Sequence, residues 1–175
     1  MTAVPDRQET GLAAPSDGLA AHARALLDTN RYLVLGTVDP AGQPWTTPVY
    51  FAAAGLREFY WTSEITAVHS RNLAQRAHVS IVVFDSSVRP YHGRAVYAVG
   101  TASELHGDDL DRGLRVYPGP NDRGATAVTR DDVTGSSPYR LYRTTATEMW
   151  VLCPREPRQP CPLHGLDRDH RTRVE

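Results

Sequence analysis

Residues 31–51 read RYLVLGTVDPAGQPWTTPVYF and contain two β-rich runs separated by a turn. The runs cover residues 31–38 and 45–51, and both are rich in β-branched and aromatic side chains. Asp39-Pro40-Ala41-Gly42 lies between them and supplies the residue types that favour a tight turn. Strands joined by so short a connection pair antiparallel, so this stretch predicts a β-hairpin.

Similar runs continue outward from this hairpin. The pattern predicts further strands over residues 58–62, 79–84, 94–104, 139–143 and 148–152, and helices over residues 66–76 and 108–117, with at most one helical turn near residues 129–133. A helix beginning at Asp17 is expected to bury one face, made of Leu19, Ala23, Leu26 and Leu27. The run VSIVVF at residues 79–84 is almost continuously apolar and predicts burial on both faces. Gly100 interrupts its strand and indicates a bulge or a barrel bend.

The sum is six to seven short strands with flanking helices, without alternating strand and helix units. This order predicts a mainly β (α+β), antiparallel barrel or sandwich. We expect residues 18–153 to form the folded domain and residues 1–17 to form a flexible lead-in. Residues 154–175 contain four prolines and alternating charges, and they predict an extended C-terminal arm.

The composition excludes several functions. All 19 basic side chains are arginine, against 20 acidic ones, and the net charge is −1. Without lysine there is no Schiff-base lysine and no phosphate loop of the GxxxxGK[ST] type. The near-neutral charge argues against nucleic acid or an anionic membrane as partner. No apolar run reaches roughly 20 residues, the N-terminus lacks the pattern of a secretory signal, and two cysteines are too few for a disulfide framework, so a cytoplasmic protein is expected.

Polar residues gather around the end of the third predicted strand. Trp61-Thr62-Ser63 precedes a helix whose first turns carry His69, Ser70 and Arg71, and helix starts favour anions. By residue type this is a candidate phosphate cradle. The alternative is that Thr66 caps the helix while His69 and Arg71 are solvated, and helix caps are far commoner than anion sites.

Four segments, taken together, resemble the pyridoxamine 5′-phosphate oxidase-like family of flavin-binding split β-barrels. The segments are LVLGTVDPAGQPWTTPVYF, FYWTS, HSRNLAQRAHVSIVVFDS and YAVGTASEL, and they occur in the family's order over about residues 20–152. The resemblance implies a homodimeric split barrel with two cofactor sites at the subunit interface. It implies FMN as cofactor, with the deazaflavin F420 as the alternative.

The resemblance also assigns binding residues. Trp45, Thr46, Thr47 and Pro48 would run along the isoalloxazine ring, Trp61, Thr62 and Ser63 would meet the ribityl chain, and the helix start with His69, Ser70 and Arg71 would take the phosphate. The vitamin B6 oxidases place Arg and Lys at positions that align with Val68 and His69 here. This chain has neither, so His69, Arg71, hydroxyls and helix amides would have to hold the phosphate. The basic residues that mark the substrate site of the vitamin B6 oxidases are not identifiable, so vitamin B6 oxidation is not predicted.

Catalytic residues cannot be assigned from the spacing. Tyr50, Tyr91, His92 and Arg94 are candidates to line a substrate pocket, with exposed loop and strand positions as the equally good alternative. The expected function is a flavin-dependent oxidoreductase acting on a small organic substrate, with NAD(P)H as a candidate co-substrate. The alternatives are an F420-dependent reductase and a non-catalytic flavin- or haem-type binding protein on the same barrel.

The C-terminal arm carries the residue types of a zinc site. Cys153, Cys161 and His164 are followed by His170, but seven residues lie between the cysteines rather than the usual two to four. On that spacing no metal site is expected. Incidental thiols in an extended arm, or an arm that wraps a partner subunit, are the competing interpretations.

Overall fold

The computed structural model describes residues 15–174. The predicted lead-in over residues 1–17 therefore lies outside the described residues, except for its last three. Helix α1 (Pro15–Thr29) is followed by a single antiparallel sheet, and the other helices are α2 (Val68–Leu73) and α3 (Gly107–Val116). Two short 3₁₀ turns, η1 (Asn121–Arg123) and η2 (Asp131–Val133), lie before the last long strand.

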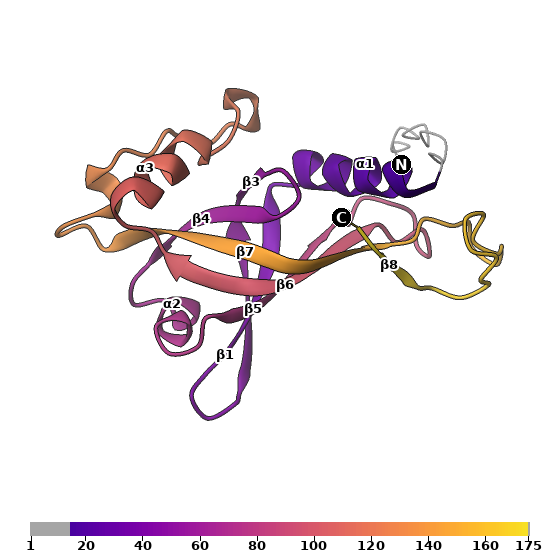
Figure 1. The fold of residues 1–175 in the computed structure, drawn as a ribbon, viewed down its shortest axis with the longest axis horizontal. Helices are drawn as coiled ribbons and strands as arrows, with labels where there is room; N and C mark the ends of the chain where they lie inside the picture. Colours follow the sequence, from indigo (N-terminus) through magenta and orange to yellow (C-terminus); the bar gives the residue numbers. More distant parts are fainter. Residues whose placement is uncertain (1–14, 175) are drawn as a thin grey trace, which may run out of the picture.

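The described sheet has eight strands in the order β2-β1-β5-β6-β7-β4-β3, with β8 pairing on β7. Every pair is antiparallel, as the sequence predicts, and the sheet curls into a half-barrel (Figure 1). The strands are β1 (Tyr32–Val38), β2 (Pro44–Tyr50), β3 (Ala52–Ala54), β4 (Glu58–Glu64), β5 (His78–Phe84), β6 (Ala95–Glu104), β7 (Tyr139–Leu152) and β8 (Arg171–Arg173). The predicted hairpin is β1–β2, and its register runs from Tyr32 opposite Tyr50 to Val38 opposite Pro44.

Two strand predictions are wrong in instructive ways. The two strands expected over residues 139–143 and 148–152 are one continuous strand, β7, because β4 pairs with residues 139–145 and β6 pairs with residues 142–151 across the predicted gap. Strand β5 is not buried on both faces: Val79, Ile81 and Val83 are buried, whereas Phe84 is 48% exposed. One face of β5 meets the core and the other is more exposed, although β5 is a central strand that pairs with both β1 and β6.

Gly100 marks a break in the β6–β7 ladder, as predicted. The pairing register shifts between Val99 and Gly100. A Cβ atom on Gly100 would lie 2.2 Å from the carbonyl oxygen of Thr145, a contact with backbone that no rotamer change relieves. Glycine is therefore required here by the close approach of two strands.

The core has a larger and a smaller part. The predicted apolar face of α1, made of Leu19, Ala23, Leu26 and Leu27, is buried and packs against β5, β6 and β7. The smaller cluster lies under α3, where Leu110 packs with Tyr60 and Leu141. Figure 1 shows α1 and α3 over opposite ends of the sheet.

The C-terminal segment differs from the predicted extended arm. Strand β8 pairs antiparallel with the end of β7, and Cys161 and Val174 belong to the main core cluster. The prolines do not prevent this return, because all of them lie in the connecting loop between β7 and β8. The segment is folded onto the barrel at the end of the molecule opposite α3 (Figure 1).

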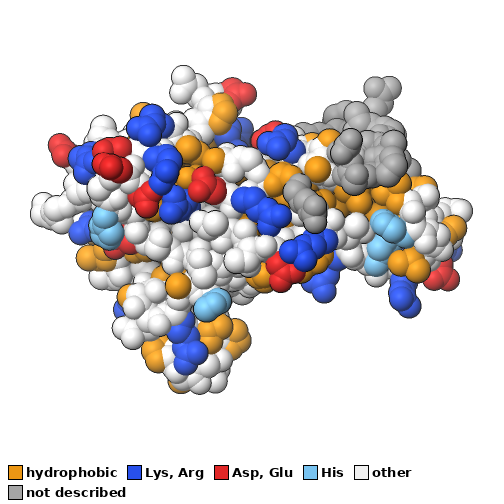
Figure 2. Space-filling view, viewed as in Figure 1, with side chains coloured by type: hydrophobic (Ala, Val, Ile, Leu, Met, Phe, Trp, Pro, Cys, Tyr) orange, Lys and Arg blue, Asp and Glu red, His pale blue; other side chains and the backbone are white. Residues whose placement is uncertain are grey.

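The surface carries mixed charges. Figure 2 shows arginine and acidic side chains interspersed on the visible face, most densely around α3 and β7, with no broad area of one sign. None of the described helices is both long and apolar enough to cross a membrane.

Candidate cofactor site

Strand β2 forms an edge of the described sheet and carries four of the predicted binding residues. Trp45, Thr46 and Pro48 are exposed, and Thr47 is half-buried. The Trp45 indole is 47% exposed, and its Nε1 donates a hydrogen bond of 2.7 Å to Thr47 Oγ1. Among the described strands β2 pairs only with β1, so backbone groups on its outer side remain available to a ligand.

The end of β4 is less accessible than the prediction implies. The Trp61 side chain is fully buried and stacks on Tyr142 with ring centroids 5.8 Å apart. The Thr62 hydroxyl shares a hydrogen bond of 3.0 Å with the Tyr117 hydroxyl. Of the predicted residues Trp61, Thr62 and Ser63, Trp61 acts through packing. Only backbone groups or the Thr62 side chain can meet a ligand directly.

His69 is not a solvated cation. It is 6% exposed, and its Nε2 is joined to Ser63 Oγ by a hydrogen bond of 2.6 Å. Burial lowers the pKa of His69 below its ordinary value, which keeps the imidazole neutral near pH 7. The side chain therefore connects the end of β4 to α2 and carries no charge toward a phosphate.

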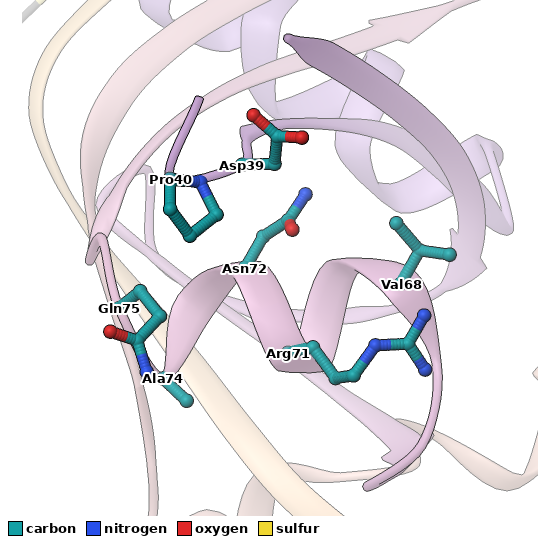
Figure 3. A pocket seen from close by; sticks show the side chains of 7 residues that line it. All are labelled: Asp39, Pro40, Val68, Arg71, Asn72, Ala74 and Gln75. Carbon is teal, nitrogen blue, oxygen red and sulfur yellow. The ribbon is translucent and has the colours of Figure 1, made fainter. Parts of the chain in front are cut away.

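Helix α2 is shorter than predicted and starts differently. It covers residues 68–73 instead of 66–76. Its N-cap residue is Ala67, which has no side chain that can cap the helix, so Thr66 is not the N-cap. Arg71 is exposed and donates to the Thr66 carbonyl oxygen, which turns its guanidinium back along the helix toward Val68 (Figure 3). Ser70, by contrast, is buried.

A pocket of about 550 Å³ lies between α2 and the β1–β2 turn. Asp39 and Pro40 from the turn face Asn72 across it, and Arg71 lies at its outer side (Figure 3). The Asn72 amide is fixed by a hydrogen bond of 3.0 Å to the Thr37 hydroxyl. One cation and one carboxylate thus border the same pocket.

A second groove, of about 480 Å³, crosses β2, β1, β5, β6 and β7. Trp45 and Thr46 line it from β2, and His78 lines it from the start of β5. Gly36 and Gly100 also line it, at positions where a Cβ atom would meet Ser80 Oγ and the Thr145 carbonyl oxygen, respectively. The sequence-based assignment included Trp45 and Thr46 but missed His78, whose position beside them depends on the β1–β5 pairing.

The candidate substrate residues do not form one pocket. The Tyr50 hydroxyl donates 2.7 Å to the Pro118 carbonyl oxygen beneath α3, and Tyr91 is 89% exposed. His92 is buried, with its Nδ1 lying 3.5 Å from Glu156, and Arg94 donates to the His92 carbonyl oxygen. Among the described residues, none of the four lines either of the two pockets.

The fold corresponds to a known class of protein, the antiparallel split barrels. The family model described as pyridoxamine 5′-phosphate oxidase matches residues 19–153. The chain therefore belongs to this family, which confirms the resemblance seen in the sequence and the predicted fold class. No curated protein matches the chain.

Solved structures with this fold have different described roles. A haem-binding protein from Mycobacterium smegmatis is 21% identical over 92% of this chain, with a TM-score of 0.65, and the chain spans 59% of that protein's length. HutZ, a haem storage protein from Vibrio cholerae, is 16% identical over 76% of this chain and 94% of its own, with a TM-score of 0.56. An F420 reductase is 22% identical over 72% of this chain and 94% of its own, with a TM-score of 0.51. At these identities they show the shared fold alone.

Proposed function

We propose that this chain is a flavin-dependent oxidoreductase that binds FMN beside strand β2 and acts on a small organic substrate. The observation that carries the proposal is the open outer edge of β2 with the exposed Trp45 indole, next to the pocket formed with α2. Membership of the pyridoxamine 5′-phosphate oxidase family supports it.

The ring end of a flavin fits this edge. An isoalloxazine ring presents alternating hydrogen-bond donors and acceptors, which the backbone of an edge strand can match. Thr46 and Thr47 add hydroxyls, and Trp45 adds a flat apolar surface. When bound, the flavin supplies hydride transfer, and the protein supplies position and shelter from water.

The phosphate end of the cofactor would meet fewer positively charged side chains here than the family pattern provides. With His69 neutral, Arg71 is the cation that borders the α2 pocket, and Asp39 lies in the same pocket. An arginine can hold a phosphate through two parallel hydrogen bonds. Among the described residues, Arg71 is the one cation in the lining of this pocket, which leaves little positive charge for an oligoglutamate tail, so FMN is favoured over F420 as cofactor.

The assembly and location remain part of the proposal. We expect a homodimer in which a second copy covers the β2 edge and completes each site, with NAD(P)H as a candidate co-substrate and the cytoplasm as location. Light scattering after size exclusion measures the mass directly. If a monomer bound FMN with full affinity, a second copy would not be part of the cofactor site.

A spectrum of the purified protein, followed by titration with FMN and with F420, tests the cofactor. We expect flavin absorbance and an FMN affinity that falls in Trp45→Ala. Phe84→Ala is the matched control, because Phe84 is 48% exposed and Trp45 is 47% exposed, but Phe84 lines neither pocket. Equal affinity in both variants, or no binding of either cofactor, would contradict the proposal.

Haem binding is the second candidate function, and His78 is the observation that favours it. His78 lines the same groove as Trp45, and histidine is the usual axial ligand of haem iron. Haem titration of the wild type and His78→Ala separates the two candidates. A haem absorbance band that requires His78, together with no FMN binding, would establish haem binding in place of flavin chemistry.

A further inference from the structure

Four side chains with metal-binding atoms converge at the C-terminal end of the barrel. Cys153, Cys161, His164 and His170 place one ligand atom each so that all four atoms lie within 4.8 Å of one another. Both cysteines are buried and unbridged, and the histidines lie toward the surface. In Figure 2 histidine side chains are visible at this end of the molecule, where Figure 1 places β8.

Two of the four residues are positioned by the sheet. Cys153 directly follows β7, and His170 directly precedes β8. The Cys153 backbone N–H donates a hydrogen bond of 3.0 Å to the His170 carbonyl oxygen, which extends the β7–β8 ladder by one step. The ladder thus places together two residues that are far apart in sequence.

The other two are positioned by a tight turn. The Cys161 carbonyl oxygen accepts hydrogen bonds from the N–H groups of His164, at 3.3 Å, and Gly165, at 2.7 Å. Gly165 has φ of +67°, a conformation that glycine adopts without steric cost. The Cys161 N–H donates 2.7 Å to the Leu166 carbonyl oxygen, so the turn is closed on both sides.

Four of the six distances between the ligand atoms are close to those around a tetrahedral ion, and the other two, from His170 to the sulfurs, are within 4.8 Å. Metal–sulfur bonds of about 2.3 Å and metal–nitrogen bonds of about 2.05 Å imply sulfur–nitrogen edges of about 3.6 Å and nitrogen–nitrogen edges of about 3.3 Å. His164 Nδ1 lies 3.5 Å from Cys153 Sγ and 3.6 Å from Cys161 Sγ. His170 Nε2 lies 3.1 Å from His164 Nδ1. The two sulfurs, at 3.2 Å, need only a small rotation to reach the ideal edge of about 3.8 Å.

A second interaction fixes the orientation of one imidazole. His170 Nδ1 lies 3.1 Å from the Arg168 carbonyl oxygen. A proton on Nδ1 satisfies that carbonyl and leaves the Nε2 lone pair directed at the cluster. Metal-binding histidines commonly have this backbone support.

We propose that these four side chains form a structural zinc site. Two sulfurs and two imidazole nitrogens in a tetrahedral arrangement are the ligand set that selects Zn²⁺. Binding displaces the thiol protons of Cys153 and Cys161 to solvent, uses the neutral imidazole lone pairs and oxidises nothing. Two thiolates neutralise the charge of the ion, so the complex can lie at the margin of the core.

The site would fasten the C-terminal segment to the barrel. Cys153, Cys161 and Val174 belong to the main core cluster, and Leu163 packs against it. All four coordination positions are filled by side chains, which is typical of structural rather than catalytic zinc. The inference does not depend on the identity of the cofactor beside β2.

Metal analysis and cobalt substitution of the full chain test the proposal. We expect about one Zn²⁺ per chain in protein purified without chelator. After removal of the metal, added Co²⁺ alone should give the absorbance of a tetrahedral thiolate complex, which Zn²⁺ then displaces. Because this readout uses the wild type, it does not depend on whether variants fold.

Variants then assign the ligands. His170→Gln should weaken Co²⁺ binding at least tenfold, and Cys161→Ser should also reduce the thiolate absorbance, whereas His106→Gln should change neither. His106 is the control because its side chain is 77% exposed, lies beside Glu104 and is not part of the Cys/His cluster. The proposal would be overturned if the wild type bound Co²⁺ no more tightly than His170→Gln does, or if the Co²⁺ complex showed no tetrahedral spectrum.

A disulfide between the two cysteines is the competing chemistry. It predicts no thiols in denatured, unreduced protein and no metal, and that result would also overturn the proposal. Two reactive thiols that are protected in the native protein and released by a chelator would support zinc. The positions of His164 and His170 favour zinc, because a disulfide gives neither imidazole a role.

Discussion

The β2–α2 end and the C-terminal end of this barrel arrange their polar side chains in opposite ways. At the β2–α2 end the predicted binding residues are spread along an edge strand and a short helix, and several act within the fold. At the C-terminal end four ligand atoms converge within 4.8 Å. The first arrangement suits a large planar cofactor held by many weak contacts, whereas the second suits a single ion.

The difference shows that residue type is a poor guide to role without burial. His69 and His170 are both histidines close to polar partners. His69 is joined to Ser63 inside the fold, whereas His170 directs Nε2 toward a second imidazole and two sulfurs. Variants that separate fold from ligand binding at each end therefore test the contrast directly.

The largest expected effect is at Trp61. Trp61→Ala removes a fully buried ring stacked on Tyr142 and should lower the free energy of unfolding by about 3–5 kcal/mol. Trp45→Ala, at an exposed position, should lower it by less than about 0.5 kcal/mol while weakening the cofactor. Urea denaturation measures both changes. If Trp61→Ala lowered the free energy of unfolding only slightly, the Trp61 ring would again be a candidate to contact the ligand.

Zinc should stabilise the protein by the next largest amount. At free Zn²⁺ of 100 times the dissociation constant, the free energy of unfolding should rise by up to about 2.7 kcal/mol, and less if the unfolded chain also binds the ion. Thermal unfolding with Zn²⁺ and with chelator measures the change. Cys161→Ser should abolish the response, and a response retained in that variant would place the ion elsewhere.

Arg71 should have a smaller effect, and on binding alone. Arg71→Ala should weaken FMN about tenfold, or about 1.4 kcal/mol, because one charge-assisted contact to phosphate is lost. Arg24→Ala is the control, since Arg24 is an exposed arginine on α1 and lines neither pocket. Equal losses in both variants would indicate a general electrostatic effect.

The sequence predicted the fold well where local pattern determines it. The β1–β2 hairpin and the register break at Gly100 follow from turn residues and from glycine in a strand. The joining of two predicted strands into β7 does not, because it depends on partners on both sides. The burial of β5 on one face only likewise depends on what packs against it.

The sites were predictable to different degrees for the same reason. The exposed residues of β2 were found through the family resemblance, which carries long-range information. The Cys/His cluster was set aside on spacing, because the spacing rule assumes that ligands share one loop. Here the β7–β8 ladder supplies Cys153 and His170, and only tertiary structure shows that.

The smallest expected effect is a pH dependence from His69. Because burial lowers the pKa of His69, the folded state favours the neutral ring. Above pH 6.5, the ordinary value, both states are neutral and the stabilisation is fully present. As the pH falls below 6.5 the unfolded chain takes up a proton first, so the free energy of unfolding should decline until the pH passes the folded pKa.

Urea denaturation between pH 7.5 and pH 5.5 measures this decline. His69→Gln keeps an amide to meet Ser63 but cannot titrate, so its decline should be shallower than that of the wild type. Some decline should remain, because burial also lowers the pKa of His22. A His69→Gln profile parallel to the wild type would mean that burial does not lower the pKa of His69, and it would restore this residue as a candidate cation for the cofactor phosphate as the pH falls.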